Sequence, residues 1–200
     1  MERKGKMLNH RTLLNHRFPV GLKMRESEER SLRFKVVAVG GTFDELHKGH
    51  RALLATAFKY GERVWIGLCT DEFARKLRKN HDIAPYEDRM RELTKFLKGS
   101  GVLDRAKITP LSDPFGPAAT SEEIEAIVVS RETEARAREL NALRIKNGLK
   151  PLEIIVIDMV LAEDRIPIST TRIRHGEIDR EGKILKRIKR ACLSRITRKA

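Results

Sequence analysis

The stretch Val36–His50 constrains the fold of this 200-residue chain more than any other segment. Its first part, Val36–Val39, is a short β-branched apolar run, typical of a strand buried on both faces. The pair Gly40–Gly41 follows, and glycines allow a tight turn and a close approach to a ligand. Apolar residues then recur at helical spacing over Arg51–Tyr60, so a helix N-terminus is predicted at 47–50. Such an end attracts anions, which makes this stretch a candidate phosphate site.

Two histidines, His47 and His50, lie three residues apart at this predicted helix end, with Gly49 between them. The common phosphate loops do not fit, because neither Gly-x-x-x-x-Gly-Lys-Ser/Thr nor Gly-x-Gly-x-x-Gly occurs here. Zinc binding by the histidine pair is disfavoured, since no cysteine or further histidine lies nearby in the sequence. The plain alternative is a surface helix cap with two solvated histidines.

A second candidate site lies far along the chain, in Ile168–Arg174, after the last predicted strand. Ser169, Thr170 and Thr171 place three hydroxyl groups at a predicted helix start, where they can donate to phosphate. Arg172 can add a two-pronged donor. The alternative for this segment alone is an N-cap run with a solvated arginine.

Together these two segments resemble the His-x-Gly-His and Ile-Ser-Ser-Thr-Arg signatures of the nucleotidyltransferase superfamily. Over about residues 35–180 the chain is similar to archaeal-type phosphopantetheine adenylyltransferases, on the further segments Gly67–Ala74, Pro85–Arg89, Asp113–Ala118, Ile127–Thr133 and Gly176–Asp179. The resemblance implies transfer of the adenylyl group of ATP to 4′-phosphopantetheine in coenzyme A biosynthesis. Two alternatives remain: a nucleotidyltransferase of the same fold that acts on nicotinamide mononucleotide, a flavin precursor or glycerol phosphate, and an RNA-binding protein.

The resemblance also implies roles for individual residues. His50 and Lys76 would be catalytic, with Lys79 as the rival for the lysine, and Thr42 would hold the acceptor phosphate. ATP phosphates would be bound by Gly40, Gly41, His47, Gly49, Arg131, Ser169, Thr170, Thr171 and Arg172. Mg²⁺ would accompany ATP, and no metal site built from protein ligands is expected. One residue departs from the family pattern: Arg165 stands where a glycine is expected.

The resemblance and the pattern of elements agree on the fold class, an α/β Rossmann-like nucleotidyltransferase fold. Five short apolar runs alternate with helical segments, which predicts a five-stranded parallel sheet with helices on both faces. The strands are predicted at 36–39, 64–69, 106–111, 124–129 and 152–158. Asp113–Pro117 is predicted as a non-helical turn, and Lys183–Ile196 as a last helix that packs on the domain or on a second copy. A homo-oligomer is therefore one possibility.

Charge is distributed unevenly along the chain. The formal net charge is +14, but residues 1–33 contribute +5 and 181–200 contribute +7, which leaves +2 for 34–180. We therefore expect a basic, flexible leader at 1–33, a nucleotidyltransferase domain at 34–180 and a basic C-terminal helix at 181–200. A nearly neutral domain argues against a dedicated nucleic-acid partner.

The cellular compartment is predicted from the small number of cysteines and from the absence of long apolar runs. Two cysteines, Cys69 and Cys192, suggest no disulfide framework and a reducing compartment. No apolar run is long enough to span a membrane, and the leader has no apolar core of a secretory signal. We expect a cytoplasmic protein with no membrane partner.

Overall fold

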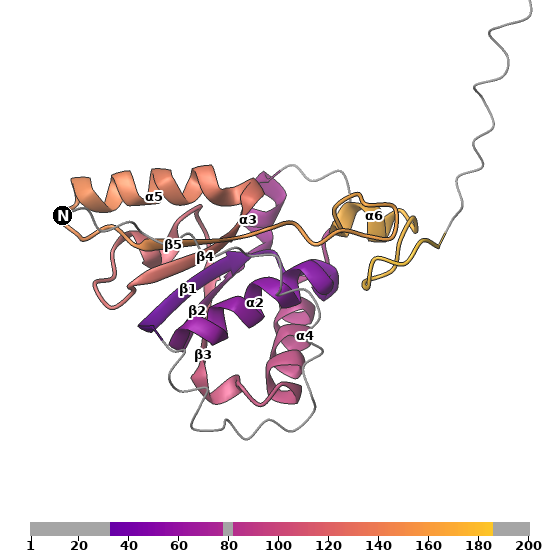
Figure 1. Ribbon diagram of the computed structural model, residues 1–200, viewed down its shortest axis with the longest axis horizontal. Helices are drawn as coiled ribbons and strands as arrows, with labels where there is room; N and C mark the ends of the chain where they lie inside the picture. Colours follow the sequence, from indigo (N-terminus) through magenta and orange to yellow (C-terminus); the bar gives the residue numbers. More distant parts are fainter. Residues whose placement is uncertain (1–32, 78–81, 186–200) are drawn as a thin grey trace, which may run out of the picture.

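The computed structural model describes residues 33–77 and 82–185. Its centre is a parallel five-stranded sheet, which confirms the prediction, and the strand order is β3-β2-β1-β4-β5 (Figure 1). The strands are β1 (Phe34–Gly41), β2 (Gly61–Cys69), β3 (Ala106–Leu111), β4 (Ala126–Ser130) and β5 (Glu153–Ile157).

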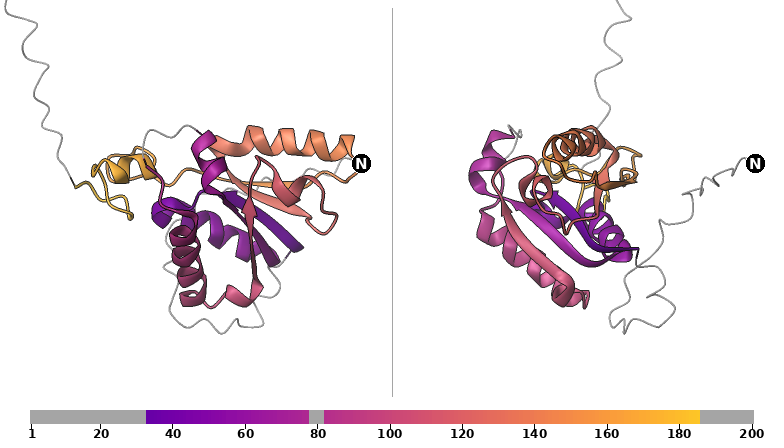
Figure 2. Two further views of the ribbon diagram at one scale, coloured as in Figure 1. Left: turned by 180° about the vertical axis from the view of Figure 1, so that it is seen from behind. Right: turned by 90° about the vertical axis from the view of Figure 1, so that its left-hand side faces the viewer.

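Helices cover both faces of the sheet, as the two views in Figure 2 show. α2 and α4 lie on one face and α5 lies on the other. The side chains of β1 alternate between the two hydrophobic cores: Val37 and Val39 face α2 and α4, whereas Val36 and Ala38 face α5. The helices are α2 (Lys48–Tyr60), α3 (Asp71–Lys76), α4 (Tyr86–Gly99), α5 (Glu134–Lys146) and α6 (Thr170–Arg174).

The strand order reverses beside β1. The chain runs outward from β1 to β2 and β3, then returns to place β4 on the other side of β1. In open parallel sheets, ligands bind at the carboxyl ends of the strands where the order reverses. α6 lies past this edge, beside residues 44–46 (Figure 1). We therefore expect a binding site at the segment that follows β1 and at α6.

Two predicted turns differ in the structure. Gly40 and Gly41 are the last residues of β1, and the left-handed turn falls instead at Phe43 and Glu45. The segment predicted to be non-helical continues into a 3₁₀ turn at Gly116–Ala119. Proline is tolerated in a first helical turn because the N–H it lacks has no intrahelical partner there.

The predicted last helix is wrong over its described part. Lys183 to Leu185 are not helical, and Ile184 forms an isolated antiparallel bridge with Ile178. A pairing with an upstream segment therefore overrides the helical spacing there. The rest of the predicted helix and the leader up to residue 32 lie outside the described residues. None of the described helices is both long and apolar enough to cross a membrane.

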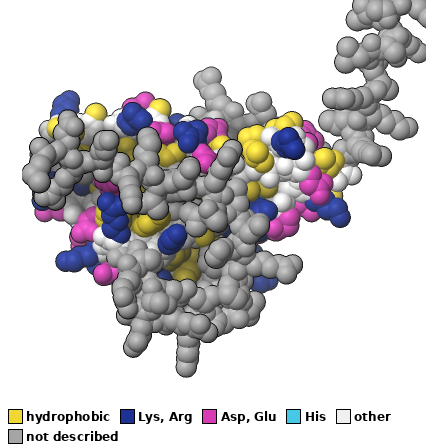
Figure 3. Space-filling view, in the orientation of Figure 1, with side chains coloured by type: hydrophobic (Ala, Val, Ile, Leu, Met, Phe, Trp, Pro, Cys, Tyr) yellow, Lys and Arg dark blue, Asp and Glu magenta, His cyan; other side chains and the backbone are white. Residues whose placement is uncertain are grey.

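The charges on the described surface are mixed in sign. Figure 3 shows Lys and Arg side chains interspersed with Asp and Glu over the part of this face that belongs to described residues. Several charged side chains of the described residues are paired, as in Arg131–Asp158 and Arg138–Glu134. This mixture agrees with the small net charge of residues 34–180.

Candidate active site

The N-terminus of α2 is built around His47. His47 is the N-cap residue, and its Nδ1 accepts hydrogen bonds from the backbone N–H groups of Gly49 (3.2 Å) and His50 (3.4 Å). Because Nδ1 accepts, the proton of the neutral imidazole lies on Nε2. The N–H at Nε2 is a ring donor, which is the kind of group that suits a phosphate oxygen.

The two histidine rings are stacked, with centroids 3.8 Å apart and planes 20° from parallel. The ring of Phe43 contacts His50 at 5.3 Å between centroids. A Cβ on Gly49 would lie 3.0 Å from Cε1 of His47, so glycine leaves room for the folded-over imidazole. His47 is only 7% exposed, which contradicts the alternative of two solvated cap residues.

The loop that joins β1 to α2 is strained. Phe43 has φ 47° and Glu45 has φ 55°, both in the left-handed region that side chains with a Cβ rarely adopt. Each such residue costs about 1–3 kcal/mol and persists only where its surroundings hold it. Thr42, just before the turn, is buried. The predicted acceptor-phosphate residue thus sits at the start of a strained loop.

The second signature holds this loop in place. The Thr170 hydroxyl donates to the Asp44 carbonyl oxygen at 3.0 Å, and Arg174 donates to Asp44 Oδ1 at 2.8 Å. Arg174 and Arg180 also pair with Glu45, at 3.0 and 2.7 Å. The two motifs, far apart in sequence, therefore meet at one edge of the sheet, as the resemblance implied.

Ser169 and Arg172 make contacts within the segment 164–177, to which both belong. Ser169 is the N-cap of α6 and its hydroxyl accepts from the Arg172 N–H at 3.4 Å. The Arg172 side chain donates to Asp164 and to Glu177, the latter at 3.0 Å. Partial burial lowers the pKa of Arg172, but these two carboxylates outweigh it and raise the pKa above its ordinary value. The predicted phosphate fork is thus held by two carboxylates in this structure.

Two predicted cations lie in more open positions. Arg131 follows β4 in a 3₁₀ turn and pairs with Asp158 at 2.9 Å, and both side chains are mostly exposed. This hydrogen bond raises the pKa of Arg131. Lys76 is exposed on the last turn of α3, whereas Lys79 lies outside the described residues. Arg131 and Lys76 follow the carboxyl ends of β4 and β2, on the edge where the signatures meet.

Sequence reasoning gave no role to Asp44 or Arg174. Asp44 is fully buried and accepts from Arg174 and from the Ala84 N–H at 3.2 Å. The signal available in the sequence was the aspartate that ends Gly-Gly-Thr-Phe-Asp. Its arginine partner lies 130 residues away, so the sequence alone offered no way to pair them.

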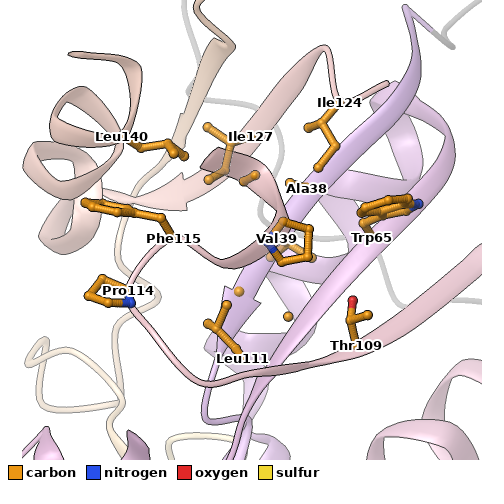
Figure 4. Close-up of a pocket in the computed structure, with 14 residues that line it drawn as sticks. Ala38, Val39, Trp65, Thr109, Leu111, Pro114, Phe115, Ile124, Ile127 and Leu140 are labelled. Carbon is orange, nitrogen blue, oxygen red and sulfur yellow. The ribbon is translucent and has the colours of Figure 1, made fainter. Parts of the chain in front are cut away.

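A shallow, mostly apolar concavity of about 60 Å³, open to solvent, adjoins the site on the α5 face of the sheet. Trp65 and Phe115 lie on opposite sides of it in the view of Figure 4, and Leu111, the last residue of β3, also lines it. Gly40 belongs both to its lining and to the end of β1 that leads into the histidine motif. A ligand could therefore contact the phosphate site and the apolar surface together.

Comparisons with known proteins agree with this geometry. The cytidylyltransferase-like family model matches residues 38–176. A phosphopantetheine adenylyltransferase from Methanothermobacter thermautotrophicus is 52% identical over 163 residues, covering 82% of this chain and 97% of the relative. One from Methanopyrus kandleri is 48% identical over 147 residues, covering 74% and 92%.

Among solved structures, a protein of unknown function from Archaeoglobus fulgidus aligns with a TM-score of 0.54 and 29% identity. The alignment covers 61% of this chain and 88% of that one. The two signatures meet at one sheet edge, and the curated relatives span most of the chain. The protein therefore belongs to the archaeal phosphopantetheine adenylyltransferases, within the cytidylyltransferase-like family.

Proposed function

We propose that this chain transfers the adenylyl group of ATP to 4′-phosphopantetheine, giving dephospho-coenzyme A and pyrophosphate. The observation that carries the proposal is the junction of the two signatures, in which Thr170 and Arg174 hold Asp44 beside His47. The curated relatives with this name support the choice of acceptor. Substrates of this kind are metabolites of the cytoplasm, where we propose that the protein acts.

The reaction needs no protein nucleophile. An oxygen of the acceptor phosphate attacks the α-phosphorus of ATP, and the bond from that phosphorus to the bridging oxygen of the β-phosphate breaks. Because the acceptor is already an anion, catalysis consists of positioning and charge stabilisation. Pyrophosphate leaves with the bonding electron pair.

Each site residue takes a part in that positioning. The buried Thr42 would orient the acceptor phosphate, and His50 would donate to the α-phosphate as charge develops. The Nε2–H of His47 would donate to nucleotide phosphates, aided by the positive end of α2. Arg131, Lys76 and the hydroxyls of Ser169 and Thr171 would stabilise the leaving pyrophosphate, whereas the buried Thr170 hydroxyl holds the Asp44 carbonyl oxygen.

Mg²⁺ is proposed as the ion that accompanies ATP. Within the described residues, no three His, Cys, Asp or Glu side chains gather at a place that could hold a metal. The donors at the site are imidazole, hydroxyl and guanidinium groups, which suit phosphate rather than Mg²⁺. The ion would take its ligands from the triphosphate and water, as Mg²⁺ commonly does, and would neutralise phosphate charge.

The apolar concavity supports an acceptor with a long, largely uncharged arm. Such an arm can leave a phosphate held near Thr42 and pass Gly40 to reach the surface between Trp65 and Phe115. Glycerol phosphate has no group to fill this space. The concavity therefore favours phosphopantetheine over glycerol phosphate.

A panel of acceptors tests the proposal. Pyrophosphate release is measured with ATP, Mg²⁺ and, in turn, 4′-phosphopantetheine, nicotinamide mononucleotide, flavin mononucleotide and glycerol 3-phosphate. Phosphopantetheine should give a kcat/KM at least about tenfold above the others, a difference of about 1.4 kcal/mol. A higher kcat/KM with another acceptor would assign the chain to that substrate.

Salt-dependent RNA binding that survives removal of both basic ends, with no turnover, would point instead to the RNA-binding alternative.

A further inference from the structure

Arg89, in the first turns of α4, is 1% exposed and lies beneath the site. Its Nε donates to the Ala84 carbonyl oxygen at 2.7 Å, and its Nη1 donates to those of Thr42 (2.9 Å) and Cys69 (2.8 Å). Its Nη2 pairs with Asp71 Oδ1 at 2.7 Å. One guanidinium thus joins the carboxyl ends of β1 and β2 to the starts of α3 and α4.

Burial of the Arg89 guanidinium has a cost in free energy. Removing a guanidinium from water carries a large penalty, and well-packed apolar residues often stabilise a core at least as well. What apolar side chains cannot supply is a rigid, planar set of donors that fixes several carbonyl groups at once. The contacts of Arg89 are of this kind, and they converge on the loop that follows β1.

Arg89 acts on that loop from two sides. It binds the carbonyl oxygen of Thr42 directly, and the left-handed turn begins at the next residue, Phe43. It also binds the carbonyl oxygen of Ala84, whose N–H donates to Asp44 Oδ1 at 3.2 Å. Phe43, the first strained residue, therefore lies between Thr42 and Asp44, two points that depend on one guanidinium.

We propose that Arg89 is a positioning residue for the acceptor phosphate, because it fixes Thr42 at the start of the strained loop. The inference rests on the proposed function, in which Thr42 orients that phosphate. Lysine has a single ammonium group and cannot make the four contacts together. Arg89→Lys should therefore displace Thr42 while keeping the positive charge.

The test is a double-mutant cycle in the full-length protein. We measure kcat and both KM values for wild type, Arg89→Lys, Thr42→Ala and the double variant. Arg89→Lys should raise the KM for phosphopantetheine about tenfold and change the KM for ATP less than about threefold, since a misplaced contact weakens one substrate selectively. In the Thr42→Ala background it should add less than about twofold, because interacting residues are not additive. Independent, additive effects would overturn the proposal.

Arg105→Lys is the matched control. Arg105 also donates to three backbone carbonyls, of Phe58, Gly61 and Glu62, but these lie where β2 begins, at the opposite edge of the sheet. Its replacement should lower the melting temperature and leave the acceptor KM unchanged. A rise in acceptor KM equal to that of Arg89→Lys would show a general loss of stability and would contradict the positioning role.

A milder variant and a binding measurement keep the test decisive. If Arg89→Lys does not fold, Asp71→Asn removes the charge that holds Nη2 and should raise the acceptor KM in the same direction by about two- to threefold. Calorimetric titration with phosphopantetheine, without ATP, should show the same weakening. Wild type that releases no pyrophosphate with phosphopantetheine refutes the proposed function itself. Active wild type with unchanged acceptor affinity in the folded variants refutes this inference alone.

Discussion

At the scale of single residues, the N-cap hydrogen bonds of His47 give the two histidine rings different roles. His47 uses Nδ1 to hold the first turn of α2, and its ring stacks on that of His50 at 3.8 Å. His47 thus supports the helix and fixes its neighbour, whereas we assign the transition-state contact to His50. This division gives the two positions different kinetic signatures.

His50→Ala should lower kcat and leave ATP binding little changed, because a donor aimed at the α-phosphate contributes most where charge develops. By analogy with loss of one oxyanion donor, the expected decrease is on the order of 10² to 10³ in kcat, or about 2.7–4 kcal/mol. Steady-state kinetics with phosphopantetheine measure it. A kcat within a few-fold of wild type would remove His50 from the mechanism.

His47→Asn serves as the matched variant for that experiment. Asparagine is a good N-cap residue, so the helix start should be retained while the imidazole is lost. The KM for ATP should then rise more than kcat falls, since we assign His47 to ground-state phosphate binding. The comparison separates loss of the cap from loss of the ring.

Arg165 supplies a second prediction at this scale. It has φ 64°, so the position where the family pattern led us to expect glycine has the backbone that glycine favours. Arg165→Gly should remove about 1–2 kcal/mol of backbone strain. Glycine also gives the unfolded chain more conformational entropy than arginine does, and this offsets about 0.4–1 kcal/mol of the gain. Urea unfolding should therefore show a modest net stabilisation.

Arg165→Ala is the control, because it removes the side chain but keeps the Cβ that causes the strain. The bond from the Arg165 N–H to the Ala162 carbonyl oxygen, 3.0 Å long, is available to all three residues. Equal stability of the alanine and glycine variants would show that backbone strain at this position is negligible.

At the scale of elements, the strands and the helix start at His47 were predictable because their signals are local. The apolar runs at 106–111 and 64–69 correspond to β3 (Ala106–Leu111) and to most of β2 (Gly61–Cys69). The loop between β1 and α2 was not predictable, because Phe43 and Glu45 adopt left-handed backbone that their residue types disfavour. Tertiary contacts from Arg89 and α6 impose that conformation.

The junction of α3 and α4 depends on pH through Asp71. Slight burial raises the pKa of its carboxyl, but hydrogen bonds from the Tyr86 N–H and from Arg89 outweigh it and hold the pKa below the ordinary value. A lowered folded-state pKa stabilises the fold above the unfolded pKa, and this contribution is lost as pH falls through the folded pKa. The junction should therefore weaken only in acid.

Chemical unfolding of wild type and Asp71→Asn across pH measures this contribution. Because the Asp71 side chain is 44% exposed, the expected difference at pH 6–7 is on the order of 0.5–1 kcal/mol. It should shrink toward zero below about pH 4, where the unfolded carboxyl protonates. A difference that stays constant across this range would mean that the ionised carboxylate adds nothing to the junction.

At the scale of the whole molecule, the site is assembled from segments whose proximity only the topology explains. The order β3-β2-β1-β4-β5 brings the residues after β1 and β4 to one edge. α6 completes the site through Thr170 and Arg174, each more than 120 residues from Asp44. Sequence could predict that the two signatures meet, because the resemblance implied it. It could not predict that Arg172 pairs with Asp164 and Glu177, which requires the path of the intervening loop.

The same topology predicts the effect of removing the basic leader. β1 begins at Phe34 and is flanked by β2 and β4, so it is held as a central strand by pairing on both sides. Arg33 already joins the domain through its N–H, which donates to the Tyr60 carbonyl oxygen at 2.8 Å. Every residue assigned to the site lies after Val39. The domain from residue 33 onward therefore contains all parts that the proposed reaction requires.

Deletion of residues 1–32 should accordingly leave kcat and both KM values within about twofold of the full-length protein, the range of changes remote from buried features. Pyrophosphate release and a thermal melt are measured on both forms at the same ionic strength, since removing part of the positive charge alters long-range attraction to anionic substrates. A truncated protein that melts as the full-length one does but has lost turnover would place the leader in the site. A loss confined to low salt would instead assign the leader a part in attracting ATP.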